Sequence, residues 1–497
     1  MMKTALVLSS LVLLFSGTAA AAVPKGDIMY VKGQLGKFAP VKIEADKKLM
    51  GKKQRKLVDE LVKAARVMDE IFLRQVWDGN LKMREELRNA GKAASPLADY
   101  FNIMFGPFDR LEHNKPFIEG VGKKPAGAAF YPKDMTKEEF ASWIKRNPAD
   151  KDAFESTFTV IRRNQGKLVA VPYSREYEDL LAKAAGHLRR AAELTDNESL
   201  KKFLRSRADA FVSNDYYQSD VDWVRLKDHD IEVVIGPYEV YEDELMGYKG
   251  AFEAFITRVD PEESARLQKI GSSIAQLERH LPIADEHKGK GRSLESPIVV
   301  VQLIFSAGDS KAGVQTLAFN LPNDERVRNE DGSKKVLLKN VQHAKFEKIL
   351  LPIAKEVMLP DQVSRVGFEP FFAHTLIHEI SHGIGPGEIV KNGRKTTVNR
   401  ELKDIYSVLE ECKADTLGIY NLAYLIDKGF YREEMKKTMW PTYLAGMFRS
   451  VRFGINSAHG GGNAIQFNYI LDKGGFVYDG KTGRFGVNEE KLLGAAR

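Results

Sequence analysis

The stretch FFAHTLIHEISHG, residues 371–383, carries two histidines four residues apart within a segment of helical apolar spacing. His378 and His382 then lie one turn apart on one face of a helix, where both imidazoles can bind a single Zn2+. Glu379 follows the first histidine and can reach a water at the metal as a general base. The pattern HExxH therefore predicts a metal site with its own base, and a structural helix with an ordinary histidine pair is the alternative.

A second helical segment, residues 409–415 (LEECKAD), supplies the acidic side chains that such a site needs. A carboxylate from Glu411 completes a set of three ligands and leaves the fourth position open, as a catalytic zinc requires. Asp415 lies four residues later on the same face, so we expect it to orient one ligand imidazole through its other ring nitrogen. We expect Glu410 to do the same for the second histidine.

Glu388 is a competing third ligand. The sequence HGIGPGE, residues 382–388, mimics a longer zinc motif with a glutamate in the last ligand position. The glycines and the proline in it are equally typical of a helix stop. If Glu388 were the ligand, the acidic side chains of the second helical segment would have no assigned role.

The composition is that of a globular protein. Of the 497 residues, 43% are hydrophobic and 29% charged, with 40 Gly and 19 Pro, which excludes collagen-like, low-complexity and disordered chains. This length favours two or three lobes, and a cleft between lobes is a natural place for a site. The single cysteine excludes an intramolecular disulfide.

The net charge of +7 comes from one region. Residues 25–66 hold 12 basic and 5 acidic side chains, an excess of 7, so the rest of the chain is nearly neutral. The basic run has no interleaved aromatic residues and no nucleic-acid motif, which favours a solvated helix face. We therefore predict no nucleic-acid partner, and no oligomeric state follows from the sequence.

The first 22 residues, MMKTALVLSSLVLLFSGTAAAA, have the pattern of a secretory signal peptide. A lysine precedes an apolar stretch that ends in small residues, and the stretch is shorter than the roughly 20 residues of a spanning helix. We expect an exported protein, periplasmic or secreted, with no stable membrane anchor once the signal is removed.

The order of predicted elements indicates an α+β fold with two lobes around a cleft. Helical periodicity runs through residues 54–73 and 176–213, and strand signals follow at 231–241 and 298–305. A polar loop is predicted at 323–335, and helical spacing returns from about residue 345 onward. We predict a signal peptide (1–22), a helical and mixed α/β lobe with a small β-rich core (23–344) and a mostly helical zinc lobe (345–497). Residues 261–297 are alternatively part of the zinc lobe.

Several separate blocks resemble the dipeptidyl peptidase III family of M49-type zinc exopeptidases, particularly the short branch that plants fuse to a Nudix module. Besides the two zinc segments, the blocks are IGPYEVY (235–241), AFNLPN (318–323) and RSVRFGINSAH (449–459), within about residues 95–475. The resemblance implies one Zn2+ per chain and release of dipeptides from the free amino terminus of oligopeptides. The nearest string to a Nudix box lacks its spaced glycines, so nucleotide hydrolysis is not implied.

The resemblance also implies roles for residues outside the zinc segments. Glu239 would bind the substrate's amino terminus, and Tyr241 would polarise the carbonyl of the cleaved bond. Asn320 and Asn323 would bind the substrate's amine and backbone, and His459 would stabilise the transition state. Without the resemblance, Tyr241 is a strand aromatic, Asn320 and Asn323 are turn residues around Pro322, and His459 precedes a glycine-rich loop.

One departure from the family concerns the zinc helix. Most members carry a six-residue motif, HExxGH, whereas this chain has the five-residue HEISH. We therefore expect a regular helix at this point. The alternative enzyme functions are an exported zinc endopeptidase and another amide hydrolase. A catalytically silent peptide-binding protein is the alternative from another class, and zinc content together with hydrolysis of a dipeptidyl-arylamide separates it from the enzyme.

Overall fold

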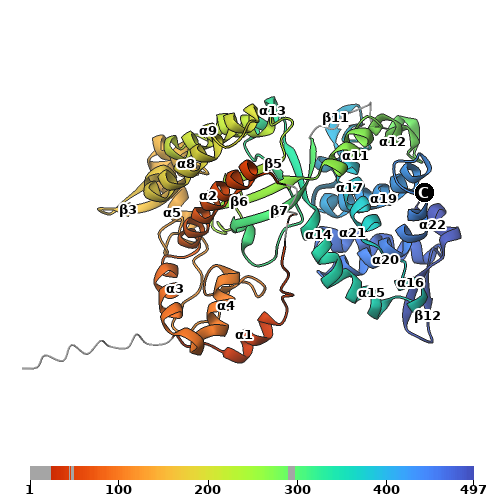
Figure 1. The fold of residues 1–497 in the computed structure, drawn as a ribbon, viewed down its shortest axis with the longest axis horizontal. Helices are drawn as coiled ribbons and strands as arrows, with labels where there is room; N and C mark the ends of the chain where they lie inside the picture. The colour runs from red at the N-terminus through yellow and green to blue at the C-terminus, as the bar shows by residue number, and fades with distance from the viewer. Residues whose placement is uncertain (1–23, 44, 46–49, 289–296, 497) are drawn as a thin grey trace, which may run out of the picture.

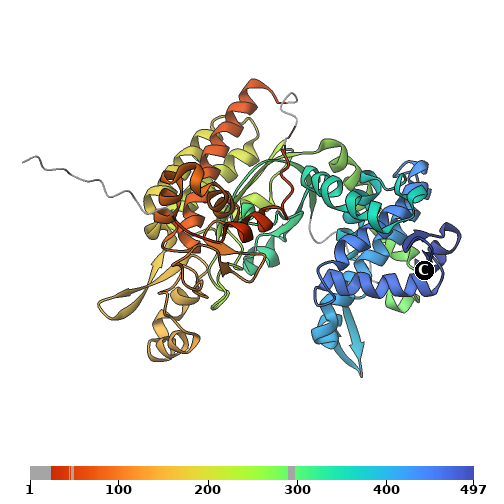
Figure 2. The same ribbon diagram turned by 90° about the horizontal axis from the view of Figure 1, so that it is seen from below.

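The computed structural model describes residues 24–43, 45, 50–288 and 297–496. Helices gather in two lobes on either side of a twisted sheet, and the C-terminus lies at the far end of the second lobe (Figure 1). A view turned by 90° shows the same two groups with the sheet between them (Figure 2). The predicted signal peptide lies outside the described residues. Within the described residues no helix combines the length and the apolar character needed to cross a membrane.

The first lobe is mostly helical. Its helices are α1 Ile28–Leu35, α2 Lys52–Val76, α3 Asn80–Asn89, α4 Ser95–Met104, α5 Lys137–Arg146, α6 Lys151–Glu155, α7 Tyr173–Glu176, α8 Glu178–Ala192, α9 Glu198–Ser213 and α10 Tyr217–Val224. Its small hairpins pair β1 Phe108–Asp109 with β2 Lys115–Pro116 and β3 Thr159–Asn164 with β4 Lys167–Pro172.

The helical spacing of the first lobe predicts α2 but not the break between α8 and α9. The predicted helix 54–73 is confirmed within α2, which buries Leu61, Met68 and Phe72. The helical periodicity across 176–213 belongs to two helices, because the Asn197 side chain accepts a hydrogen bond from Leu200 N and starts α9 afresh.

A five-stranded sheet forms the centre of the molecule. The strands are β5 Ile231–Pro237, β6 Phe252–Val259, β7 Ile298–Gly308, β8 Ala318–Leu321 and β9 Lys334–Leu338, in the order β5-β6-β7-β9-β8. Only β7 and β9 run parallel. Strand β8 is therefore an edge strand, and its Asn320 lies opposite Lys335 of β9.

Two predicted segments differ from the structure. The strand expected over 231–241 ends at Pro237, although two backbone hydrogen bonds, Tyr238 N to Ala251 O at 3.1 Å and Ala251 N to Glu239 O at 2.8 Å, continue the pairing for two residues. The loop expected over 323–335 contains the short helix α13, Glu325–Glu330, and the start of β9. The Asp324 carboxylate accepts from Arg326 N at the start of α13, and this local cap outweighs the polar composition.

The second lobe is built from helices. They are α11 Pro261–Gly271, α12 Ile274–His280, α14 Lys339–Lys345, α15 Leu351–Val357, α16 Pro360–Val363, α17 Phe368–Ser381, α18 Val398–Leu402, α19 Tyr406–Asp427, α20 Lys436–Val451, α21 Ala458–Asp472 and α22 Glu489–Ala496. Two hairpins, β10 Glu388–Lys391 with β11 Arg394–Thr397 and β12 Phe476–Asp479 with β13 Arg484–Val487, complete it. Helical structure thus resumes at Lys339, close to the predicted position.

The buried apolar side chains form two clusters with the sheet between them. Alternate residues of β9 point to opposite sides, so Val336 and Leu338 join the first cluster and Leu337 joins the second. Helices α11 and α12 also contribute Ile270 and Leu277 to the second cluster. The α+β class with a helical lobe and a mixed lobe is confirmed.

Candidate active site

Helix α17 carries His378 of the HEISH motif, and His382 is the residue that caps its C-terminal end. Its apolar side chains, including Phe372, Leu376 and Ile380, are buried in the second cluster, which holds the helix in place and leaves the histidine face toward α19. His382 N donates to His378 O at 3.3 Å, so the i→i−4 pattern continues through the motif. The helix is regular at this point, as the five-residue spacing predicts.

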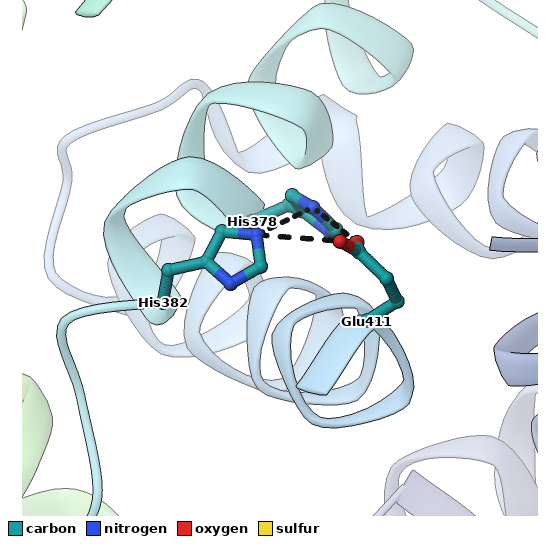
Figure 3. Close-up of side chains that lie close together, drawn as sticks. All are labelled: His378, His382 and Glu411. Atoms are coloured by element: carbon teal, nitrogen blue, oxygen red, sulfur yellow. Dashed lines mark hydrogen bonds and ion pairs between the residues drawn. The ribbon is translucent and has the colours of Figure 1, made fainter. Parts of the chain in front are cut away.

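The side chains of His378, His382 and Glu411 converge on one point between α17 and α19 (Figure 3). The two imidazole Nε2 atoms lie 3.2 Å apart. Glu411 Oε2 lies 3.3 Å from Nε2 of His378 and 3.9 Å from Nε2 of His382. Two nitrogens and one oxygen from two helices therefore face a common position, as in a three-ligand zinc site.

The other nitrogen of each imidazole is held by a carboxylate from α19. Asp415 Oδ1 accepts from His378 Nδ1 at 2.7 Å, and Glu410 Oε1 accepts from His382 Nδ1 at 2.9 Å. An ionised carboxylate only accepts, so each Nδ1 carries a proton, which leaves each Nε2 as the nitrogen that a metal would bind. Asn463 Nδ2 donates to the second oxygen of Asp415 at 2.9 Å and fixes that carboxylate in turn.

The electrostatics of the site favour a cation at the common position. Burial lowers the pKa of His378, but hydrogen bonds to Asp415 and Glu411 outweigh it and raise that pKa to about 10. Burial raises the pKa of Glu411, yet the bonds to His378 and His459 outweigh it and hold it far below its ordinary range. A metal must therefore displace a proton, so its affinity falls as the solution becomes more acidic.

The donor set fits a zinc ion. Glu411 Oε2 is buried and faces three imidazole nitrogens, at 3.3 Å from His378, 3.9 Å from His382 and 3.0 Å from His459. A buried carboxylate in this position is costly unless positive charge balances it, and a bound cation supplies that charge. Imidazole nitrogen and carboxylate oxygen are both ordinary zinc ligands.

Helix α21 brings His459 to the same carboxylate. His459 Nδ1 lies 3.0 Å from Glu411 Oε2, while more than half of the imidazole side chain remains exposed. The glycine-rich stretch after His459 is the first part of this helix and not a loop. A Cβ at Gly462 would lie 2.9 Å from Cys412 N of α19, so glycine permits the close approach of the two helices.

The base candidate Glu379 has a partner from the sheet, which the spacing of residues along the sequence does not predict. Lys335 of β9 places its Nζ 3.1 Å from Glu379 Oε2 and 3.2 Å from the backbone oxygen of the same residue. The two residues come from the sheet and from α17, so the contact joins the two lobes. Alternation along β9 places Lys335 on the face of Leu337, but only the strand register reveals this neighbour.

The residues expected to grip the substrate lie along the sheet side of the site. Glu239, Tyr241 and Asn323 line one cavity, whereas Asn320 lines another together with Glu379 and His382. Burial raises the pKa of Glu239, and the Glu239 charge raises that of Tyr241. The Tyr241 side chain is 79% exposed and does not line the cavities that contain the histidines.

Glu388, the alternative third ligand, begins strand β10 in a hairpin. Its side chain lies outside the described part of the structure. Among the described side chains, Glu411 is the carboxylate that groups with both His378 and His382 as a possible metal ligand.

Comparison with known proteins places these features in a family. The profile of Peptidase family M49 matches residues 135–416. Nudix hydrolase 3 of Arabidopsis thaliana is 40% identical over 515 residues, which covers 93% of this chain and 66% of the plant protein. Dipeptidyl peptidase 3 of Homo sapiens is 25% identical over 275 residues, 49% of this chain and 36% of the human protein. The chain thus spans less than two thirds of either relative.

Two solved structures share the fold over nearly their whole length. That of DPP III from Caldithrix abyssi has a TM-score of 0.89 and 56% identity, covering 94% of this chain and 89% of that chain. The structure of dipeptidyl-peptidase III from Corallococcus sp. strain EGB has a TM-score of 0.76 and 41% identity, and the match covers 95% of this chain and 88% of that chain. Since the family profile matches more than half of the sequence, the chain belongs to Peptidase family M49.

Proposed function

We propose that this chain is a zinc-dependent dipeptidyl peptidase that releases dipeptides from the free amino terminus of oligopeptides. The observation that carries the proposal is the convergence of His378, His382 and Glu411, with each Nδ1 held by a carboxylate. When bound there, Zn2+ supplies Lewis acidity, which polarises an amide carbonyl and lowers the pKa of water.

Glu379 is the proposed general base. Its carboxylate lines the cavity that contains His378 and His459, so it can take a proton from the attacking water and pass it to the leaving amine. His459 is exposed beside Glu411 and can donate to the oxygen that becomes negative in the transition state. Tyr241 can do the same only if the two lobes approach one another around the peptide.

The proposed grip on the amino terminus sets the position of cleavage. Glu239 is half-buried, and a charge-assisted hydrogen bond between a carboxylate and an ammonium contributes about 1.5–3 kcal/mol. Asn323 shares a cavity with Glu239, and Asn320 shares one with Glu379. The three residues from Asn320 to Asn323 span at most about 11 Å, which is long enough to place the two asparagines one extended dipeptide, about 7 Å, apart.

The test uses a dipeptidyl-arylamide and its N-acetylated form with the purified, zinc-analysed protein. We expect one zinc per chain, turnover of the substrate with a free amine, and almost no turnover of the acetylated substrate. The variant Glu239→Gln should reduce the difference in rate between the two substrates. Equal rates on both substrates would indicate an endopeptidase, and zinc without any turnover a silent binding protein. Metal analysis of Glu411→Ala and Glu388→Ala decides the third ligand, since only the first variant should lose zinc.

We also propose that the chain is exported to the periplasm or the medium, on the basis of residues 1–22. Fractionation of the producing cells, followed by determination of the mature amino terminus, tests this. Cleavage near residue 22 supports export, whereas an intact leader in the cytosol contradicts it.

A further inference from the structure

Three cations lie together beside the catalytic cavity without anionic partners. Lys345 ends α14, and Arg449 and Arg452 lie in and just after the last turn of α20. The three are called the cation cluster below. Within the described part of the chain, none of them has a carboxylate within 4.0 Å; Lys345 Nζ donates to Gln315 O, and Arg452 Nε donates to Arg449 O at 2.9 Å.

The cluster carries electrostatic strain that an anion would relieve. Burial and then the charges of Arg449 and Arg452 lower the pKa of Lys345 to about 8. Burial and the charge of Arg452 also lower the pKa of Arg449, whose Nε is buried without a hydrogen-bond partner. The Arg449 guanidinium lies 5.9 Å from the Phe371 ring, a contact that holds the side chain but does not neutralise it.

The cluster opens into the cavity of the proposed reaction. Arg449 lines the cavity of about 380 Å³ that also contains His378, Glu379 and His459. Thr316, next to the Gln315 carbonyl that holds Lys345, lines it as well. Arg449 therefore faces the space in which the reacting bond would lie, and Lys345 and Arg452 add their positive charge from behind this wall of the cavity.

The segment from Asn323 back to Thr316, which includes β8, runs from the proposed binding site of the substrate's amino terminus to the cation cluster. Asn323 lines the same cavity as Glu239, and Asn320 lines the same cavity as Glu379. Thr316 lines the cavity that contains Arg449 of the cation cluster. A peptide whose amino terminus is held at Glu239 and whose bond is cleaved near Glu379 then has its leaving part at the cluster. The four residues from Asn320 to Thr316 span at most about 14 Å, the length of two to four residues of leaving peptide.

We propose that the cation cluster of Lys345, Arg449 and Arg452 binds a carboxylate of the leaving part of the substrate, which is the C-terminal carboxylate of a short oligopeptide or an acidic side chain at that distance. The proposal rests on the proposed function for the direction of the peptide. It makes the chain selective for peptides that carry a negative charge in the residues after the cleaved bond.

Three pentapeptides of one sequence test the proposal: a free acid, its C-terminal amide, and an amide with Asp at the fourth position. We expect kcat/KM of the wild type to be at least tenfold higher for the free acid than for the plain amide, since a charge-assisted bond contributes about this much. If the Asp-containing amide restores the kcat/KM of the free acid, the cluster binds side-chain carboxylates as well as the C-terminal carboxylate. If it does not, the cluster binds the C-terminal carboxylate alone. Similar rates on all three overturn the proposal.

The variants Lys345→Met and Arg449→Met/Arg452→Met should reduce the acid-to-amide ratio to about twofold or less. Arg449→Lys keeps the charge and should keep most of the ratio, which guards against a folding defect. Lys348→Met, an exposed lysine one turn away, is the matched control and should leave the ratio unchanged. Ratios that stay at the wild-type value in the Met variants overturn the proposal.

Two further measurements separate this inference from the proposed function. A dipeptidyl-arylamide has no carboxylate, so its hydrolysis by the wild type tests the proposed function without the cluster; complete resistance of this substrate would refute only the proposed function. Calorimetric binding to Glu379→Gln needs no turnover. Tighter binding of the free acid than of the amide supports the cluster, and equal binding overturns it.

Discussion

Replacing Gly462 with alanine should separate α21 from α19 and disturb the site without touching a proposed ligand. The new Cβ would lie 2.9 Å from Cys412 N and 3.1 Å from Val408 O. Both are backbone atoms of α19, so they cannot rotate away, and ordinary contact at 3.4 Å requires a shift of about 0.5 Å between the helices.

The magnitude follows from two opposing effects. Alanine in place of a helical glycine stabilises by about 1 kcal/mol, whereas overpacking a close contact costs about 1–3 kcal/mol. Gly186→Ala is the matched control, because its Cβ would meet only the flexible end of Arg190 at 3.5 Å in helix α8. Gly462→Ala should therefore be less stable than Gly186→Ala by about 1–3 kcal/mol in urea unfolding followed by circular dichroism.

The same shift should reduce activity. It lengthens the contacts from α21 to α19, which are His459 Nδ1 to Glu411 Oε2 at 3.0 Å and Asn463 Nδ2 to Asp415 Oδ2 at 2.9 Å. Because a misplacement of 1 Å costs about a hundredfold, a shift of half that size should lower kcat on a dipeptidyl-arylamide by about tenfold. If Gly462→Ala matches Gly186→Ala in both stability and kcat, the close approach of the helices does not determine the site.

The other predictions concern single groups. Glu379→Gln should keep zinc, measured by metal analysis, while turnover falls by about two to four decades or more; near-normal turnover would exclude it as the base. His459→Ala should lower kcat and kcat/KM together with KM little changed, and an effect on KM alone would make it a binding residue. Asp415→Asn should weaken zinc binding about 10–100-fold in a chelator competition, and unchanged affinity would contradict its role in orienting His378. Burial raises the pKa of Glu232, but the charge of Lys334 outweighs burial and lowers that pKa to about 2, so the pair stabilises the fold above pH 4.5 and loses its effect as the pH falls toward 2. The free energy of unfolding should therefore change less between pH 5 and pH 3 in Glu232→Gln than in the wild type. An equal change in both proteins would contradict the pairing.

Features that depend on neighbours within one helix were accessible from the sequence alone. The spacing of His378 and His382 places both imidazoles on one face of α17, and that of Glu411 and Asp415 does the same on α19, because helical geometry repeats every 3.6 residues. The apolar periodicity of α2 is equally local. The division into helical and mixed lobes follows from the order of such segments along the chain.

Features that depend on how elements pack were decided only by the tertiary structure. The approach of Lys335 to Glu379 requires the strand register of β9 and the packing of the sheet against α17. The position of His459 depends on a glycine-rich stretch that looks like a loop in sequence but forms the first part of α21. Gly462 allows this helix to pack closely against α19, where a side chain would have no room. Residue spacing describes one element at a time, whereas these contacts join residues tens of positions apart, and only the packed core brings such residues together.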